Sequence, residues 1–188
     1  MLEPLNVSRE TFEDFEEYSS LILSRNKKIN LIGRGTEKIL RHRHIIDSAQ
    51  IIDFIDKNEK ICSDIGSGPG LPGIVLAIIM KHKKISMKFN LYEKSFRKTE
   101  FLNEVINKFN LNAEVFQKNI FEEKNLVTDT LVSRAFKPLP TILNLVNNNF
   151  KKSNSIILFL GKSGREHLLK CRGIWNFEYK EKKKFNKP

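Results

Sequence analysis

Hydrophobic and polar positions follow two different periods along this 188-residue chain, and the change occurs near residue 60. Before it, apolar side chains recur every three or four positions over 7–25, with acidic residues between them. A second stretch of helical spacing covers 36–54, and the loop NKKINLIGRG separates the two stretches. This spacing predicts helices that precede the first strand. We therefore expect an N-terminal helical extension over residues 1–58.

From residue 60 onward, short apolar runs alternate with helical stretches. The runs predict strands at 60–65, 87–93, 113–117, 130–133 and 155–160, and a weaker one at 177–185. The stretches between them predict helices at 71–82, 96–107, 138–150 and 164–174. Such alternation is typical of a mostly parallel sheet with helices on both faces. We predict an α/β fold for residues 59–188, packed as one unit with the extension.

The sequence SDIGSGPGLPG, at 63–73, follows the first predicted strand and fits two ligand-binding patterns. Its last three glycines match the dinucleotide fingerprint G-x-G-x-x-G. Asp64 followed by Gly66, Gly68 and Gly70 also matches acid-x-G-x-G-x-G, a pattern of loops that hold S-adenosylmethionine. Ligands of parallel sheets bind at the carboxyl ends of the strands, so this turn is the first candidate site.

Two prolines and one acid favour the second pattern. Pro69 and Pro72 lack the N–H groups that hold a pyrophosphate, and a carboxylate at Asp64 would repel it. The same carboxylate suits the ammonium and sulfonium of S-adenosylmethionine, and the glycines allow close backbone approach. Glu93, at the end of the second strand, suits the ribose hydroxyls of either ligand. We predict S-adenosylmethionine as the cofactor, with a dinucleotide-dependent oxidoreductase as the competing hypothesis.

Other site motifs are missing from the sequence. GKS at 161–163 ends like a P-loop, but its first glycine would fall on Ile156. Cys62 and Cys171 fit neither a metal spacing nor a disulfide framework, so we expect no metal and a reducing compartment. No apolar run approaches the roughly 20 residues of a membrane helix. The acidic N-terminus does not resemble a signal peptide. The expected location is the cytoplasm.

Positive charge is concentrated toward the end of the chain. Lysines and arginines exceed acids by 33 − 22 = +11, and residues 151–188 carry 11 basic and 3 acidic side chains, a net of +8. Residues 1–60 have a net charge of −1, from 10 basic and 11 acidic side chains. This asymmetry favours a surface that faces a polyanion. Alternatively, KEKKK at 180–184 is a solvated edge strand that its lysines protect from pairing.

Six segments in a fixed order carry a resemblance to a known family. They are NKKINLIG (26–33), HIIDS (44–48), DIGSGPGLPGI (64–74), EKSFRKTEFL (93–102), VSRAFKPL (132–139) and LGKSG (160–164). With them the chain resembles the bacterial RsmG (GidB) family from about residue 12 to 175. The resemblance implies a class I S-adenosylmethionine-dependent methyltransferase that acts on N7 of a guanine in small-subunit (16S) ribosomal RNA. It also implies strand order 3-2-1-4-5-7-6 with the last strand antiparallel.

The resemblance and the loop pattern together predict the site residues. Cofactor contacts are expected at Asp64, Gly66, Ser67, Gly68, Gly70, Leu71, Glu93, Ile120, Phe121 and Arg134. Glu93 is expected at the ribose, Ile120 and Phe121 at the adenine, and Arg134 where cofactor and RNA meet. The family commonly has Arg-x-Glu after the third strand, whereas Asn119 stands here at the arginine position. RNA-binding candidates are Asn30, Arg43, His44, Arg97, Lys98, Arg134 and Lys162.

This chemistry requires no catalytic acid or base. Guanine N7 carries an in-plane lone pair and no proton, so it can attack a sulfonium methyl directly, and catalysis consists of alignment. N7 lies on the major-groove edge, which is deep and narrow in A-form RNA. The target guanine should therefore lie in a loop or be splayed out of the helix before reaction.

The expected partner is 16S ribosomal RNA or the small ribosomal subunit, with no membrane and no metal. Nothing in the sequence demands a dimer, so we expect a monomer. An alternative keeps the methyl donor but makes the acceptor a small molecule or a protein. That hypothesis predicts activity insensitive to salt and a closed, apolar acceptor pocket.

Overall fold

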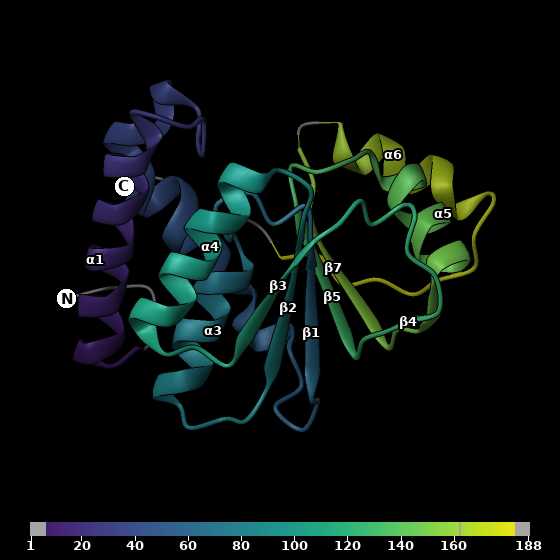
Figure 1. Ribbon diagram of the computed structural model, residues 1–188. Helices are drawn as coiled ribbons and strands as arrows, with labels where there is room; N and C mark the ends of the chain where they lie inside the picture. Colours follow the sequence, from purple (N-terminus) through teal and green to yellow (C-terminus); the bar gives the residue numbers. More distant parts are fainter. Residues whose placement is uncertain (1–6, 162, 183–188) are drawn as a thin grey trace.

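The computed structural model describes residues 7–161 and 163–182. Its main sheet is parallel throughout, in the order β3-β2-β1-β5-β7 (Figure 1). The strands are β1 (Ile61–Ile65), β2 (Lys88–Glu93), β3 (Ala113–Gln117), β5 (Thr130–Arg134) and β7 (Ser155–Phe159). The predicted α/β fold is confirmed. Because β4 (Leu126–Val127) and β6 (Phe150–Lys152) belong to a separate sheet, β5 and β7 are the fourth and fifth strands of the main sheet along the chain. The observed order therefore matches the first five positions, 3-2-1-4-5, of the expected strand order.

Helices cover both faces of this sheet. In Figure 1, α3 (Gly73–His82) and α4 (Phe96–Phe109) lie on one side, and α5 (Leu139–Asn149) and α6 (Gly164–Arg172) lie on the other. Side chains alternate between faces along a strand. Accordingly, Cys62 of β1 belongs to the core cluster on the α3 side, and Ile65 belongs to the cluster that includes α5 residues.

The direction of chain progression changes at the centre of the sheet. From β1 the chain adds β2 and then β3 toward one edge, and afterwards β5 and β7 toward the other. Loops that leave β1 and β5 therefore diverge to opposite faces and leave a crevice between them. In open α/β sheets, ligands bind at this topological switch point.

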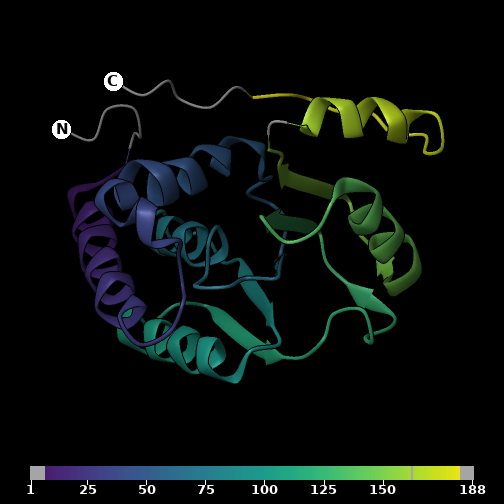
Figure 2. The same cartoon turned by 90° about the horizontal axis from the view of Figure 1, so that it is seen from above.

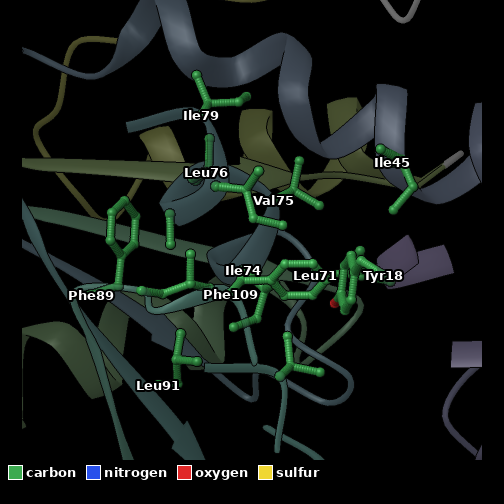
Figure 3. Packing of buried hydrophobic residues seen from close by; sticks show 14 of the residues in the cluster. Tyr18, Ile45, Leu71, Ile74, Val75, Leu76, Ile79, Phe89, Leu91 and Phe109 are labelled. Carbon is green, nitrogen blue, oxygen red and sulfur yellow. The ribbon is translucent and has the colours of Figure 1, made fainter. Parts of the chain in front are cut away.

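The N-terminal extension packs onto the α3 side of the sheet, where Figure 2 shows it curving around the outside. It begins with α1 (Arg9–Asn26), and the Ser8 side chain caps this helix by accepting a hydrogen bond from the Thr11 N–H at 3.3 Å. Buried Phe15, Tyr18 and Ile22 of α1 join one core cluster with α3, part of which Figure 3 shows. One continuous core therefore spans the extension and the sheet.

The predicted helical stretch over 36–54 is confirmed, but it is not one regular α-helix. The segment divides into a 3-10 helix η1 (Arg34–Ile39), a π-helix η2 (Arg41–Ile46), a short α2 (Asp47–Ala49) and a 3-10 helix η3 (Gln50–Phe54). Buried Leu40 and Ile45 are five positions apart, a spacing that suits a π turn better than an α turn. The wider turn also leaves His44 only partly buried, where it lines the site described below.

The C-terminal region differs from the prediction as well. Residues 177–182 form no strand, and 183–185 lie outside the described residues. Instead of pairing with the sheet, the chain returns to the extension, where the Lys182 ammonium lies 2.8 Å from the Asp53 carboxylate. Two short strands that were not predicted, β4 (Leu126–Val127) and β6 (Phe150–Lys152), pair in parallel as a separate sheet.

Candidate functional site

A cleft of about 900 Å³ lies at the carboxyl end of the sheet, at the switch point between β1 and β5. Its walls come from segments far apart in the sequence, all of which contribute lining residues. These segments are 31–36, 43–44, 66–71, 92–98, 118–121, 134–137 and 159–161. Loops that follow β1, β2, β3, β5 and β7 thus meet loops of the N-terminal extension around a single cavity.

The glycine loop after β1 forms the innermost wall. Gly66, Gly68 and Gly70 have φ of 70°, 58° and 97°, in the left-handed region that favours glycine. A Cβ on Gly66 would lie 2.2 Å from the Phe136 ring. At Gly66 there is therefore no room for a side chain, and the loop backbone lies directly against the Phe136 ring.

Asp64 lies behind the loop and does not line the cleft. Its side chain is fully buried, and its Oδ2 accepts a hydrogen bond from the Gly73 N–H at 2.9 Å. Burial raises the pKa of this carboxyl to about 7, although the Gly73 bond opposes the shift. The sequence interpretation placed this carboxylate against a cationic ligand. In this structure, its contact is with the start of α3.

Glu93 closes the cleft on the β2 side. It is 8% exposed and lines the cavity. One oxygen accepts a hydrogen bond from the Gly68 N–H at 3.0 Å, and the other accepts one from the Ser95 N–H at 2.9 Å. A carboxylate has about four lone-pair sites, so each oxygen keeps capacity for a further donor such as a ribose hydroxyl.

An apolar wall stands beyond Glu93, where the adenine was predicted. Ile120 is buried and Phe121 is 38% exposed, and both line the cleft. The Phe121 ring stacks on Phe136, with centroids 6.0 Å apart. Asn119, at the position of the family arginine, donates a hydrogen bond to the Glu122 carboxylate at 2.6 Å. This pair spans three residues of one loop.

Arg134 connects the end of β5 to the N-terminal extension. Its guanidinium donates to the His44 carbonyl at 3.2 Å and to the Ser48 hydroxyl at 3.3 Å, and also to the Arg43 carbonyl. It lies 3.4 Å from the Asp47 carboxylate, with only 11% of its side chain exposed. Burial lowers the pKa of the guanidinium, while Asp47 acts in the opposite direction. Most of the Arg134 donors are therefore engaged within the protein.

His44 continues this network along the cleft wall. Its Nδ1 lies 3.1 Å from the Arg134 guanidinium, which can only donate, so Nδ1 accepts. Its Nε2 lies 2.8 Å from the Thr36 hydroxyl, which in turn lies 2.7 Å from the Gly33 carbonyl. The chain of contacts joins three segments of the cavity wall.

Asn26 is a residue that the sequence interpretation missed. It is buried at the end of α1, and its side-chain oxygen accepts hydrogen bonds from the Leu31 N–H at 2.7 Å and the Ile32 N–H at 3.0 Å. Its amide donates to Glu37 at 2.6 Å. Leu31 and Ile32 line the cleft, so Asn26 shapes a wall without contacting the cavity. Its place within NKKINLIG was the available signal.

The predicted site residues divide into three groups. Those that line the cleft are Gly66, Ser67, Gly68, Leu71, Glu93, Ile120, Phe121 and Arg134 of the cofactor set, with Arg43, His44 and Lys98 of the RNA set. Four predicted residues do not line the cleft: Asp64, Gly70, Asn30 and Arg97. Asn30 and Arg97 are exposed, and each is next in sequence to a residue that lines it. Lys162 lies outside the described residues.

The charge of the cleft is strongly positive. Six basic side chains and one acidic side chain line it: Arg43, Lys94, Lys98, Lys118, Arg134 and Lys137, against Glu93. Arg43 comes from the N-terminal extension and the other five from residues 94–137, and no basic side chain of the described residues 151–161 and 163–182 is part of this lining. No cluster of three metal-ligating side chains occurs within residues 7–161 and 163–182. No helix in the same ranges is long and apolar enough to cross a bilayer.

Two solved structures define the class of fold. An O-methyltransferase of Thermotoga maritima, described as SAM-dependent, has a TM-score of 0.52 at 18% identity, covering 79% of this chain and 52% of the other. A Methanococcus maripaludis structure described as an S-adenosyl-L-methionine-dependent methyltransferase has a TM-score of 0.50 at 18% identity, covering 93% and 75%. The fold is that of S-adenosylmethionine-dependent methyltransferases.

Sequence comparison defines the family. The family model for rRNA small subunit methyltransferase G (GidB) matches residues 11–188. The ribosomal RNA small subunit methyltransferase G of Pelagibacter ubique (strain HTCC1062) is 46% identical over 185 residues, which cover 97% of this chain and 87% of the relative. That of Bartonella tribocorum is 36% identical, covering 92% and 81%. The chain belongs to this family, and the resemblance inferred from its motifs is confirmed.

Proposed function

We propose that this chain transfers a methyl group from S-adenosylmethionine to N7 of a guanine in small-subunit (16S) ribosomal RNA. The cleft is the observation that carries the proposal. It combines a glycine loop and an acidic strand end, at the switch point of a methyltransferase fold, with a basic lining. Relatives named ribosomal RNA small subunit methyltransferase G support the same substrate class.

The residues of the inner cleft fit the methyl donor. Gly66, Gly68 and Leu71 bring backbone with little side-chain cover to the methionine part, and Glu93 accepts hydrogen bonds from the ribose. Ile120 and Phe121 supply the apolar surface for the adenine. Asp64 supports this site indirectly, through its bond to Gly73. When bound, the donor supplies an electrophilic methyl carbon on a positively charged sulfur.

The acceptor needs alignment more than activation. Because guanine N7 has a free lone pair and carries no proton, no side chain has to remove one, and we assign no catalytic acid or base. The protein's contribution is to hold N7 in line with the methyl group. Phe136, on the cleft wall, offers an aromatic face on which a splayed guanine can stack.

The basic lining is assigned to the RNA backbone. Lys94 and Lys137 are exposed at the cleft, Lys98 is half-buried there, and none of the three forms a salt bridge with a carboxylate of the described residues. Arg97, exposed beside Lys98 at the start of α4, extends this surface. A cation in the first turn of a helix opposes the helix dipole, so Arg97 and Lys98 suit an external anion. We assign Arg43 to the same surface and Arg134 to its support.

The decisive test uses ribosomal RNA, or small subunits, from a strain that lacks the gene. Incubation with the enzyme and labelled S-adenosylmethionine should produce 7-methylguanine at one position, detected by mass spectrometry of the digested RNA. Unchanged modification in both the deletion strain and the reconstituted reaction would falsify the proposal. Transfer to small molecules or proteins at a rate insensitive to salt would support the alternative acceptor.

Two cheaper measurements address the remaining expectations. Calorimetry should give micromolar binding of S-adenosylmethionine and none of NADH, and the reverse result would support the oxidoreductase hypothesis. We also propose a monomer in the cytoplasm. Light scattering on a sizing column checks the monomer against the chain mass of 21.9 kDa, and cell fractionation checks the compartment.

A further inference from the structure

Tyr18 of α1 reaches the glycine loop from the opposite side to the cleft. Its side chain is fully buried, and its hydroxyl donates a hydrogen bond to the Pro69 carbonyl at 2.6 Å, across 51 positions of sequence. Figure 3 shows the ring beside Leu71, within the apolar cluster. Pro69 and Leu71 both line the cleft. One side chain of the extension therefore contacts the wall that the methyl donor would meet.

The loop depends on such external bonds because its own backbone is permissive. Left-handed glycines at 66, 68 and 70 flank Pro69, and glycine loses more conformational freedom on ordering than any other residue. Among the described residues, no other group donates a hydrogen bond to the Pro69 carbonyl. A buried carbonyl without a partner is costly, so the Tyr18 bond selects the loop conformation in which this oxygen points toward α1.

The hydroxyl is available as a donor at all relevant pH values. Burial holds the pKa of Tyr18 well above its ordinary value, and the nearby Asp64 carboxyl shifts it in the same direction. The ring itself packs in the core, so the hydrogen bond and the apolar contact can be separated by one substitution. Phenylalanine retains the ring and removes only the bond.

We propose that Tyr18 is a positioning residue for the methyl donor. Its hydroxyl fixes the 66–71 loop so that the backbone presented to the cleft is already in the conformation that binds. The role rests on the proposed function and concerns the donor side alone. It predicts an effect on affinity for S-adenosylmethionine that exceeds any effect on the methyl-transfer step or on RNA binding.

The test compares Tyr18→Phe with Ile22→Val, one turn further along α1. Ile22 is also fully buried in the same cluster, so removing one of its methyl groups weakens the same packing without touching the loop. Calorimetry well below both melting temperatures should show about tenfold weaker binding of S-adenosylmethionine for Tyr18→Phe. The Ile22→Val variant should remain within about twofold of wild type, as expected for a change distant from the ligand.

Two further readouts separate positioning from loss of stability. The KM for S-adenosylmethionine should rise in Tyr18→Phe, while kcat at saturating donor and RNA changes less than about threefold. Hydrogen exchange should accelerate at the Gly70 and Leu71 amides, which now bond to the Ser67 carbonyl at 2.8 and 3.2 Å.

The outcomes distinguish this role from the proposed function. If wild type binds S-adenosylmethionine and Tyr18→Phe binds it equally well, the positioning role is wrong and the methyltransferase assignment stands. Equal losses of affinity in both variants would also overturn it, since the effect would then be general destabilisation. Failure of wild type to bind the donor would overturn both proposals.

Discussion

Asp64 is a carboxyl group that water does not reach. Its pKa of about 7 exceeds its ordinary value of 3.8, so between these values the folded chain binds a proton that the unfolded chain releases. Proton binding then stabilises the folded state. The contribution is complete below about pH 4 and is lost as the pH rises through 7, where the buried group must ionise. Stability from this residue thus decreases toward alkaline pH.

Replacing Asp64 by asparagine tests that sign. Asp64→Asn keeps an oxygen that can accept the Gly73 N–H but carries no charge at any pH. We expect its melting temperature, relative to wild type, to rise by at least about 3 °C between pH 5 and pH 8. Thermal unfolding at both pH values measures this, with Glu100→Gln, an exposed carboxylate of α4, as the control. If the difference in melting temperature between Asp64→Asn and wild type is the same at pH 5 and pH 8, the raised pKa of Asp64 is wrong.

Arg134 should prove more important for structure than its predicted RNA contact suggests. Arg134→Lys keeps the charge but cannot reproduce the planar set of donors to His44, Ser48 and Arg43, so we expect a loss of about 1–3 kcal/mol. Urea unfolding measures it. The exposed Arg97→Ala is the counterpart: stability within about 0.5 kcal/mol of wild type, with weaker RNA binding. Equal stability of Arg134→Lys and wild type would contradict this role.

At the scale of residues, sequence patterns predicted which residues belong to the site better than they predicted where the side chains of those residues point. Glu93, Gly66 and Gly68 were identified from spacing and line the cleft, whereas Gly70, which is also left-handed, does not. Asp64 was identified too, but a pattern of residue types does not reveal that α3 returns over its face of the sheet and covers the carboxyl. Tyr18 was assigned to a helical stripe, and no local signal indicates that its hydroxyl has a partner 51 residues away.

Among the elements, α1 does more than pack on α3 and α4, because its last residue shapes the following loop. Asn26→Ala would leave the buried Leu31 and Ile32 amides without their acceptor, so we expect a loss of about 1–3 kcal/mol. Hydrogen exchange should accelerate at these two amides. Asn30→Ala, in the same loop but exposed, is the control for stability and should stay within about 0.5 kcal/mol. Comparable losses in both variants would show that the loop, and not Asn26, is sensitive.

The bounds of a helix or strand were predictable from sequence where burial of apolar side chains alone determines the pattern. The central strands β1 and β5 are short apolar runs because neighbours cover them, and their places in the sequence, like that of the edge strand β7, were correct within one or two residues. The segment 36–54 is helical as predicted, but its division into 3-10, π and α turns was not predictable, because a π turn alters the helical period that the prediction assumes. The strand predicted at 177–185 is wrong over the described residues 177–182, because an alternating pattern forms a strand only where a sheet edge pairs with it, and Lys182 instead lies at Asp53.

For the molecule as a whole, the basic lining makes RNA affinity a function of salt. Replacing Lys94, Lys98 and Lys137 together by alanine removes up to three phosphate contacts, so the slope of log affinity against log salt should fall in magnitude by about 2. Filter binding across a salt series measures it. The same number of exposed lysines at the other end of the sheet, Lys57, Lys60 and Lys83, provides the control. An equal change in slope there would mean that only net charge matters.

Strand order also has a consequence for how this protein is made. The central strand β1 pairs with β2, which follows within 30 residues, but also with β5, which begins at Thr130. All members of the larger buried cluster except Val132 lie at or before Leu111. One face of the sheet can therefore condense before β5 exists. From the end of β1 at Ile65 to the start of β5 at Thr130 the ribosome adds 130 − 65 = 65 residues, so at about 5–20 residues/s the β5 side of β1 stays unpaired for about 3–13 s. A nascent chain paused in that interval presents an unpaired strand edge to its neighbours.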